Sequence, residues 1–482
     1  MKHAIYLLLA ALSFTACSRV LEEKPQAIAE ENFYNSPAEV QAGLNAIYKP
    51  IRQSGSMSAL YQCQLEIYTE YMYGRGSHAP LNDYAGLDNT NITRVGDMWA
   101  QFYEAIRNAN IVIKKIPTAR NLNAADAARF TAEARFMRGL LYFHLVRNWG
   151  GVPLRAEENM AQLDVPRATT EATYQFLLAD LLYAADNLTA VPRLDGAPSK
   201  WSASAVLADV YMNLHDYTKA RDAAAAVINS GKYALVQVAT ADDYDKIFGP
   251  DVQGSPEEVF YLKFSRTPAD QGFNYPMYAH YPNSGYYKPG GYYTFYSDAV
   301  QNKFVAQWDK NDLRYKYNWY VQTFGLTNTT ILNKKFSDKV TNTAAGNDFP
   351  MYRYADIVLF YAECLARAAG APDANAMEML NQIRRRAYGK PTATPDPAVD
   401  FKLSDYSSLD AFISLVVRER TYENCSEAKH WFDLKRLGIV KQVIKDMKNI
   451  TVADKHLLWP IPTNEYNYNK AIDPVKDQNP GY

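Results

Sequence analysis

The stretch that decides the fold is residues 124–148, which read AADAARFTAEARFMRGLLYFHLVRN. Its apolar positions recur at steps of four and three: Phe130, Ala134, Met137, Leu141 and Leu145. This spacing places them on one face of an α-helix. Gly150 and Pro153 then end the helix, because glycine favours a helix C-terminus and proline cannot continue the backbone hydrogen bonding. The stretch therefore predicts a long helix with one buried stripe.

The same periodicity recurs along most of the chain. It predicts further helices over residues 37–53, 97–115, 171–189, 201–213, 216–229, 354–369, 374–388, 408–424 and 429–445. In the pair at 201–229, small residues such as Ala208 alternate with large ones such as Trp201, which resembles a tetratricopeptide repeat. We therefore predict a mainly α protein built on tetratricopeptide-like helical repeats.

Two regions, 54–96 and 231–352, lack this periodicity. Both are rich in Tyr, Asn, Gly and Pro, and hold only short strand-like runs such as 259–264. Loops this long are uncommon unless they bind something or are disordered, and their aromatic content argues against disorder. We predict that they form a loop-rich ligand face with short strands. The expected helical scaffold spans about 37–53, 97–230 and 354–445.

Composition excludes some classes of function. The 482-residue chain has a formal net charge of −1, which argues against nucleic-acid binding, since such proteins usually present a basic surface. Its 37 tyrosines are unusual, and tyrosine can work at a wet surface or pack at a core rim with only its hydroxyl exposed. The four cysteines show neither a disulfide framework nor zinc spacing. We expect Cys364 and Cys425 to be small buried hydrophobic residues.

The N-terminus carries an export signal. A positively charged start precedes a short apolar run, Ala4 to Leu12, which is too short to span a membrane. The tetrapeptide FTAC that follows resembles a bacterial lipobox, in which cleavage precedes a cysteine that receives lipid. We expect a lipoprotein signal peptide over 1–16, lipidation of Cys17 and a single domain over 17–482. The alternative is ordinary signal cleavage that leaves Cys17 unmodified.

Several motifs, in order along the mature chain, resemble the SusD/RagB family. They are AEVQAGLNAIY (38–48), WAQFYEAIRNANIVI (99–113), EARFMRGLLYFHLVRNWGGVPL (133–154), RYADIVLFYAE (353–363), LNQIRRRA (380–387), VRERTYENCSEAKHWFDLKRLG (417–438), LLWPIP (457–462) and QNPGY (478–482). One departure lies at Ala428, where the family often has glycine. Because this segment has the pattern of a core and capping region, we expect the change to affect a local turn and not ligand binding.

The resemblance implies a function. Family members are surface-exposed outer-membrane lipoproteins of Bacteroidetes that cap a SusC-type TonB-dependent transporter and help capture oligosaccharides. Some members serve oligopeptide uptake, so a peptide or another nutrient is the alternative ligand. The resemblance implies a SusD-like helical fold and no cofactor, and it agrees with the helical repeats predicted above.

The segment NSGYYKPGGYYTFY (283–296) is the main candidate for the ligand site. It concentrates aromatic rings among glycines and a proline, which favour turns. A pyranose presents a face of C–H bonds that can lie on the negative face of an aromatic ring. We predict a stacking platform from Tyr286, Tyr287, Tyr292 and Tyr293. Two arrangements remain open, because all four rings can be exposed or alternate rings can pack inward.

Five further residues complete the predicted ligand site: Tyr73, Arg75, Trp99, Trp319 and Tyr320. Trp99 matches a tryptophan that some family members use against sugar, and helix packing is its alternative role. Arg75 can hydrogen-bond a hydroxyl or a carboxylate, or serve only as a surface charge. The strand-like alternation around Trp319 and Tyr320 places one of these two rings in the core.

Sequence motifs for catalysis or metal binding are not found. There is no HExxH, GxSxG or P-loop, and DKNDLR (309–314) lacks the glycine and glutamate of a calcium loop. Glu419 and Glu423 lie among arginines on one predicted helix, so we expect surface ion pairs. A surface glycoside hydrolase is therefore the weaker alternative. The near-neutral net charge favours a neutral glycan, whereas the local cations Arg75, Lys334 and Lys335 leave uronic or sialic acids open as ligands.

Overall fold

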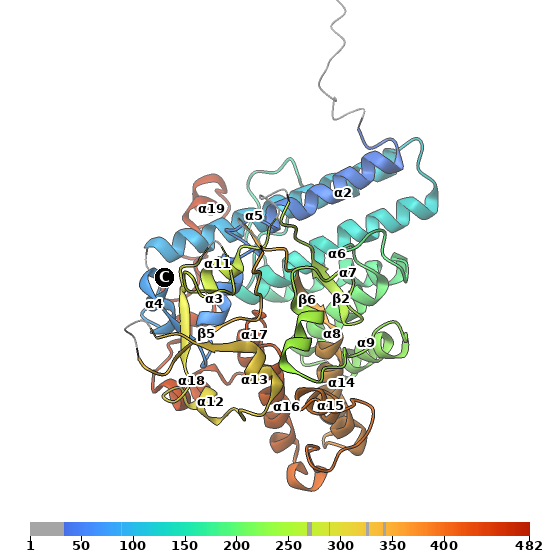
Figure 1. The fold of residues 1–482 in the computed structure, drawn as a ribbon. Helices are drawn as coiled ribbons and strands as arrows, with labels where there is room; N and C mark the ends of the chain where they lie inside the picture. The colour runs from blue at the N-terminus through green and yellow to red at the C-terminus, as the bar shows by residue number, and fades with distance from the viewer. Residues whose placement is uncertain (1–32, 88, 268–271, 289, 324–326, 341–343) are drawn as a thin grey trace, which may run out of the picture.

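The computed structural model describes residues 33–87, 89–267, 272–288, 290–323, 327–340 and 344–482. The predicted signal peptide and Cys17 lie outside these residues. Helices form most of the molecule, and shorter elements and loops cover one side of them (Figure 1). Within the described residues, no helix combines the length and the apolar character needed to cross a membrane.

The long helices follow the predicted periodicity closely. They are α2 (Pro37–Ile51), α5 (Asn89–Lys115), α6 (Ala124–Trp149), α7 (Thr170–Asn187), α8 (Lys200–Asn213), α9 (Tyr217–Asn229), α14 (Tyr354–Ala369), α15 (Ala374–Ala387) and α16 (Leu409–Glu423). The mainly α prediction is confirmed. Capping residues explain several helix starts, since Ser36 and Asn123 each accept a hydrogen bond from the backbone N–H three residues later.

Shorter helices connect these elements. The α-helices are α3 (Leu60–Ile67), α4 (Ala79–Asn82), α10 (Asp245–Phe248), α11 (Tyr275–Ala279), α12 (Lys303–Gln307), α13 (Leu313–Asn318), α17 (His430–Arg436), α18 (Val440–Lys448) and α19 (Thr463–Tyr468). The 3₁₀ helices are η2 (Gly76–His78), η3 (Ile116–Thr118), η4 (Ala241–Tyr244), η6 (Leu403–Tyr406) and η7 (Asp454–Leu457).

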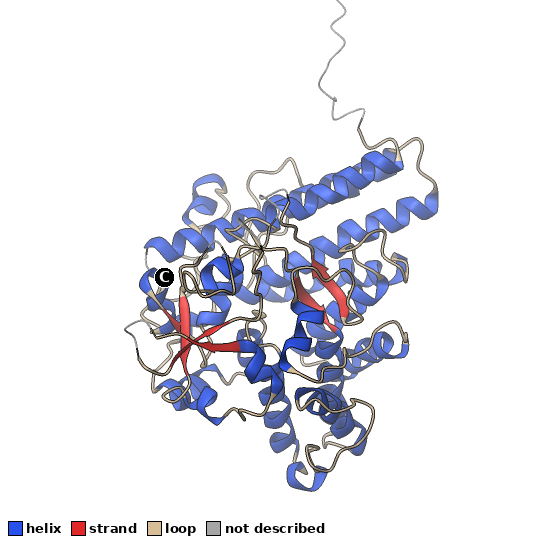
Figure 2. Cartoon of the chain, in the orientation of Figure 1, coloured by secondary structure: helices blue, strands red, loops and turns tan. Residues whose placement is uncertain are grey.

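The strands form two small antiparallel sheets, which Figure 2 shows as separate groups among the helices. One sheet has the order β1-β3-β5-β4 and the other pairs β2 with β6. The strands are β1 (Tyr73–Gly74), β2 (Glu258–Leu262), β3 (Phe295–Asp298), β4 (Trp319–Val321), β5 (Thr330–Asn333) and β6 (Phe349–Arg353). The four-stranded sheet joins the two regions that were predicted to form the ligand face, because Tyr73 pairs with Tyr296.

The scaffold is a chain of packed helix pairs. Helix α6 packs on α5 and α7, and α8 packs on α9. Helix α14 then links α9 to α15 and α16. The close approach of α6 to α7 depends on Gly139, because a Cβ atom there would lie 3.0 Å from Leu181 Cγ. The core of this scaffold includes the fully buried tryptophans Trp149, Trp431 and Trp459.

The structure differs from the predicted elements in several places, since α5 begins at Asn89 and short helices lie in both predicted loop regions; two of these differences have a clear physical reason. The predicted helix 429–445 is divided into α17 and α18, because Gly438 adopts a left-handed backbone with φ of 69°. The predicted loop region 54–96 contains α3, whose residues Tyr61–Ile67 are all buried. A helix buried on all sides shows no amphipathic stripe, so its sequence gave no periodic signal.

Candidate functional site

Six tyrosines gather where the four-stranded sheet meets the loop that runs from α11 to β3. Tyr278 belongs to α11, Tyr320 belongs to β4, and the others lie in the loop. We call this group the aromatic strip: Tyr278, Tyr281, Tyr286, Tyr292, Tyr293 and Tyr320. Tyr292 is 61% exposed and the other five are half-buried, so each combines a supported ring with access to solvent.

Ring contacts join the tyrosines of the strip in pairs. The Tyr286 and Tyr320 ring centroids lie 4.5 Å apart, and those of Tyr281 and Tyr293 lie 4.9 Å apart. The Tyr281 backbone N–H donates to the Tyr320 hydroxyl at 3.2 Å, which links the two pairs. These contacts hold neighbouring phenol rings in fixed relative positions, as a preformed binding surface requires.

The backbone beneath the rings is tightly held. Residues 292–294 hydrogen-bond to the end of α11, with Tyr292 N–H donating to Met277 O at 2.7 Å. Gly291 permits this approach, since a Cβ atom there would lie 2.0 Å from His280 O. Tyr293 itself has a φ of 38°, in the left-handed region that tyrosine rarely adopts. Such strain persists only where the surroundings enforce it, and it concentrates at functional sites.

A buried histidine forms the floor of the strip. The His280 ring is fully buried and lies nearly parallel to the rings of Tyr286 and Tyr320, with centroids 6.0 Å from each. Burial lowers the pKa of His280 to about 4, so the ring is neutral near pH 7. A neutral aromatic floor supports the tyrosines without placing a charge beneath them.

Arg75 and Tyr73 approach the strip from β1 and the residue that follows it. The Arg75 guanidinium carbon lies 3.6 Å from the centroid of the Tyr293 ring, and Arg75 Nη1 donates to Tyr292 O at 3.2 Å. Tyr73 is half-buried, and its hydroxyl accepts from Asn302 Nδ2 at 3.1 Å. The structure therefore brings Arg75 together with Tyr292 and Tyr293. Tyr73 lies on β1, where it pairs with Tyr296 of β3, and it does not belong to the aromatic strip.

Three predicted ligand residues are buried, which corrects their assignment. Tyr287 is 1% exposed, Trp99 is 4% exposed and Trp319 is 6% exposed. The Trp99 indole donates to Glu465 at 3.1 Å and packs edge-on against Trp149, so it serves the helix core. On β4, the Trp319 ring points into the core and the adjacent Tyr320 ring is half-buried. None of these rings presents a face on which a sugar can stack.

Two members of the strip, Tyr278 and Tyr281, were not predicted. They precede the quoted loop, in the segment YPMYAHYPNSGYY that begins at Tyr275. The sequence did contain a signal for these two rings, because the tyrosine-rich run begins at Tyr275, before the glycines of the loop. The prediction centred on the glycines and proline of the loop, and therefore missed Tyr278 of the short helix α11 and Tyr281 just after it.

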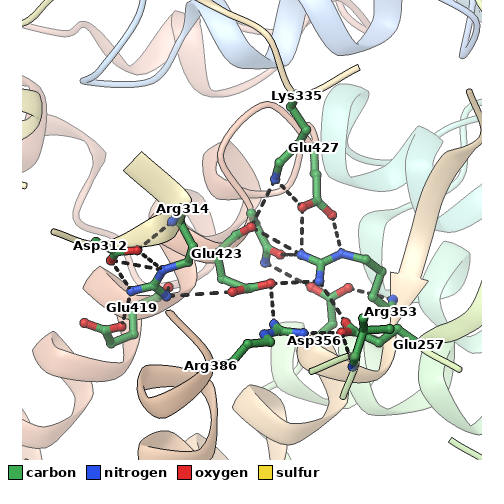
Figure 3. A network of polar contacts seen from close by, with 12 residues as sticks. Glu257, Asp312, Arg314, Lys335, Arg353, Asp356, Arg386, Glu419, Glu423 and Glu427 are labelled. Atoms are coloured by element: carbon green, nitrogen blue, oxygen red, sulfur yellow. Dashed lines mark hydrogen bonds and ion pairs between the residues drawn. The ribbon is translucent and has the colours of Figure 1, made fainter. Parts of the chain in front are cut away.

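A network of buried charges, which Figure 3 shows in close-up, links helices to loops in the interior. No member is more than 2% exposed. We call it the buried ion network: Glu257, Asp312, Arg314, Lys335, Arg353, Asp356, Arg386, Glu419, Glu423 and Glu427. Arg353 donates to Glu427 at 2.7 Å and to Glu423 at 2.8 Å, and Lys335 Nζ lies 2.6 Å from Glu427. The network thus joins α15 and α16 to the strands and loops that carry the strip.

Two expectations about these charges were wrong. Glu419 and Glu423 were expected to form surface ion pairs, yet both are buried and bound to arginines. Burial alone would raise the pKa of Glu423, but Arg386, Arg353 and Arg314 lower it to about 2. Lys335 is also unavailable to a ligand, because it is 2% exposed and paired.

The remaining sequence expectations concern cysteines and metals. The described cysteines, Cys63, Cys364 and Cys425, are free and buried, which confirms the prediction for the last two. In the part of the chain that the structure describes, no group of three His, Cys, Asp or Glu side chains is arranged to hold a metal ion.

Polar hollows also lie away from the strip. A hollow of about 540 Å³ between the end of α2 and the 194–196 loop is lined by Lys49, Arg52 and Asp195. A second, of about 590 Å³, shares Asp195 and Lys263 with the first. Lys263 is already paired with carboxylates at 2.7 and 2.9 Å, and few aromatic rings line either hollow. They therefore lack the flat surfaces that a sugar face needs.

Comparisons with known proteins agree with the fold. Residues 322–482 match the SusD family, and residues 20–212 match a family described as "Starch-binding associating with outer membrane". SusD-like protein P2 of Formosa agariphila is 27% identical over the whole of both chains. A SusD homologue from Bacteroides thetaiotaomicron superposes with a TM-score of 0.80 at 22% identity, covering 94% of this chain and 98% of that one. Surface glycan-binding protein A of Bacteroides fluxus has a TM-score of 0.75 at 21% identity, covering 92% and 100%.

Proposed function

Because this chain belongs to the SusD/RagB family of non-catalytic glycan-binding surface proteins, we propose that it captures an oligosaccharide on the aromatic strip. We further propose that it delivers this ligand to a SusC-type TonB-dependent transporter. The family is associated with the outer membrane. Lipidation of Cys17 is proposed as the attachment, and the body of the protein would then be tethered at the cell surface.

The observation that carries the proposal is the set of supported, solvent-accessible phenol rings. A sugar face can lie on the negative face of such a ring, while its hydroxyl groups reach phenol oxygens and backbone amides. The rings are ordered before the ligand arrives, since the Tyr286 ring packs on Tyr320 and the Tyr293 ring packs on Arg75. Preorganisation of this kind reduces the entropy lost on binding.

The pair Glu419 and Glu423, the carboxylates considered as a hydrolase pair, lacks the properties that hydrolysis needs. A glycosidase needs a carboxylic acid with a raised pKa beside the scissile bond. Glu423 has the opposite property, with a pKa of about 2, and it is enclosed by Arg353 and Arg386. This pair of glutamates therefore does not supply the acid and base of a hydrolase.

The experiment is a calorimetric titration of the mature protein against a panel of neutral and acidic oligosaccharides and a panel of oligopeptides. We expect saccharide binding, with no new reducing ends after prolonged incubation. Binding of peptides alone would overturn the proposal in favour of peptide uptake, and new reducing ends would overturn its non-catalytic part.

The proposed membrane attachment has its own test. Cys17→Ala removes the thiol that would receive the lipid, so we expect the protein to leave the membrane fraction of the expressing cells. Cys63→Ala, at a buried free cysteine, is the matched control and should stay with the membranes. Retention of the Cys17 variant would contradict lipidation as the anchor.

A further inference from the structure

Two lysines flank the Tyr286 end of the aromatic strip. The Lys334 ammonium lies 5.5 Å and the Lys339 ammonium lies 5.7 Å from the centroid of the Tyr286 ring. Lys334 is half-buried and Lys339 is exposed. Neither ammonium forms an ion pair with a carboxylate of the described residues, and two like charges near one ring repel each other.

Some half-buried lysines elsewhere in this protein pair with carboxylates, whereas Lys435 and Lys448 donate to backbone carbonyl oxygens instead. Lys263 contacts Glu258 and Asp348, and Lys429 contacts Asp356. Burial of an ammonium without a counter-charge is unfavourable, so such pairing is expected. Lys334 has no such carboxylate partner among the described residues, so its ammonium can take a counter-charge from a ligand.

Two neighbouring carboxylates have other partners. Asp338 is fully buried, and it accepts from Arg266 at 2.7 Å and from the Gly346 backbone N–H at 3.0 Å. Asp245 accepts the Tyr317 hydroxyl at 2.9 Å. Burial lowers the pKa of Lys334, Lys339 lowers it further, and Asp242 and Asp245 oppose this only in part.

A third cation lies at the other end of the strip. Arg75 covers the face of Tyr293 and donates one hydrogen bond to a backbone carbonyl, which leaves further guanidinium N–H groups for a ligand. The formal net charge of the chain is only −1, so this concentration of cations beside the rings is local and does not reflect a basic protein.

We propose that the captured oligosaccharide is anionic, with a carboxylate or sulfate group held between Lys334 and Lys339 while a sugar ring lies on Tyr286. The inference rests on the proposed function, because it needs the strip to be the saccharide site. Arg75 at the far end would bind a second anionic or hydroxyl group of the same chain. A repeating acidic saccharide fits this distribution, since rings and charges alternate along such a molecule.

The test uses matched ligand pairs that differ only in charge. Oligogalacturonate is compared with its methyl ester, and a carrageenan oligosaccharide is compared with its desulfated form. We expect one charged member to bind about tenfold more tightly than its neutral partner, with the preference shrinking as salt screens the charges. A preference in the first pair identifies a carboxylate, and a preference in the second pair identifies a sulfate.

The double variant Lys334→Gln with Lys339→Gln links the preference to the two lysines. We expect the ratio of charged to neutral affinity to fall to near one. The matched control, Lys232→Gln with Lys402→Gln, removes two exposed lysines outside the strip and should keep the ratio. Equal binding of charged and neutral members, or a preference that survives in the Lys334 and Lys339 variant, would overturn this inference and leave the proposed function intact. Failure of every saccharide to bind would overturn both.

Discussion

Replacing Glu427 with glutamine removes one negative charge from the centre of the buried ion network. Glu427 is fully buried, and its oxygens accept from Arg353 at 2.7 and 2.8 Å and from Lys335 at 2.6 Å. The change leaves both cations without their main partner in a region without water contact. Breaking one side of a buried ion pair costs about 3–5 kcal/mol of the free energy of unfolding.

The expected melting temperature follows from the length of the chain. The entropy of unfolding is about 2.1 cal/mol/K per residue, which gives about 1 kcal/mol/K for the 482-residue chain. A loss of about 3–5 kcal/mol therefore lowers the melting temperature by about 3–5 °C. Differential scanning calorimetry at neutral pH measures this shift directly.

The matched control is Asp454→Asn, which breaks a surface pair. Asp454 lies 2.7 Å from Lys441, and the side chains of the pair are 81% and 54% exposed. Exposed pairs contribute about 0–1 kcal/mol, so its melting temperature should fall by no more than about 1 °C. Equal shifts for Glu427→Gln and Asp454→Asn would refute the reasoning that desolvation makes the network costly to break.

Two further predictions concern stability. Glu423 and Asp433 are buried, and neighbouring arginines outweigh the burial that would raise each pKa, which falls to about 2. The stabilisation from these two ionised carboxylates is therefore complete above the ordinary carboxyl pKa of about 4 and is lost as the pH falls toward 2. The melting temperature should drop steeply over that interval. A melting temperature that stays constant across it would contradict the lowered pKa values. Ala428 has a left-handed backbone with φ of 59°, so Ala428→Gly should raise the free energy of unfolding by up to about 1 kcal/mol, whereas Ala134→Gly inside α6 should lower it by about 1 kcal/mol. Denaturant titrations that give the same sign for both variants would exclude strain at Ala428.

The sequence predicted the scaffold well, for a physical reason. Helices such as α2 (37–51) and α9 (217–229) bury one face against a neighbour, so their apolar residues repeat with the helical period. The predicted bounds 37–53 and 216–229 agree with these helices to within two residues. The signal failed at α3, where burial on every side removes the period.

The site was less predictable, because exposure depends on contacts between distant segments. Tyr286 and Tyr287 are adjacent and chemically identical, yet one is half-buried and the other is 1% exposed. The difference arises because the backbone of this segment pairs with residues near 338, which directs the Tyr287 ring inward. No local pattern encodes that pairing.

The buried ion network shows a second limit of sequence reasoning. Glu419 and Glu423 lie four residues apart among arginines, a spacing typical of an exposed helix. Their partners include Arg314, Arg353 and Arg386, which come from other parts of the chain. Charge spacing on one helix therefore gave the correct residue types and the wrong environment.

The most direct test of the central claim is a calorimetric titration of the double variant Tyr286→Ala with Tyr292→Ala, using the oligosaccharide that binds the native protein most tightly. These rings are accessible members of the strip, and Tyr468→Ala, at an 80% exposed ring on α19, is the matched control. If the strip is the saccharide site, affinity falls by at least about tenfold in the double variant, stays unchanged in the control, and the melting temperature of both remains close to that of the native protein. Unchanged affinity in the double variant would contradict the claim.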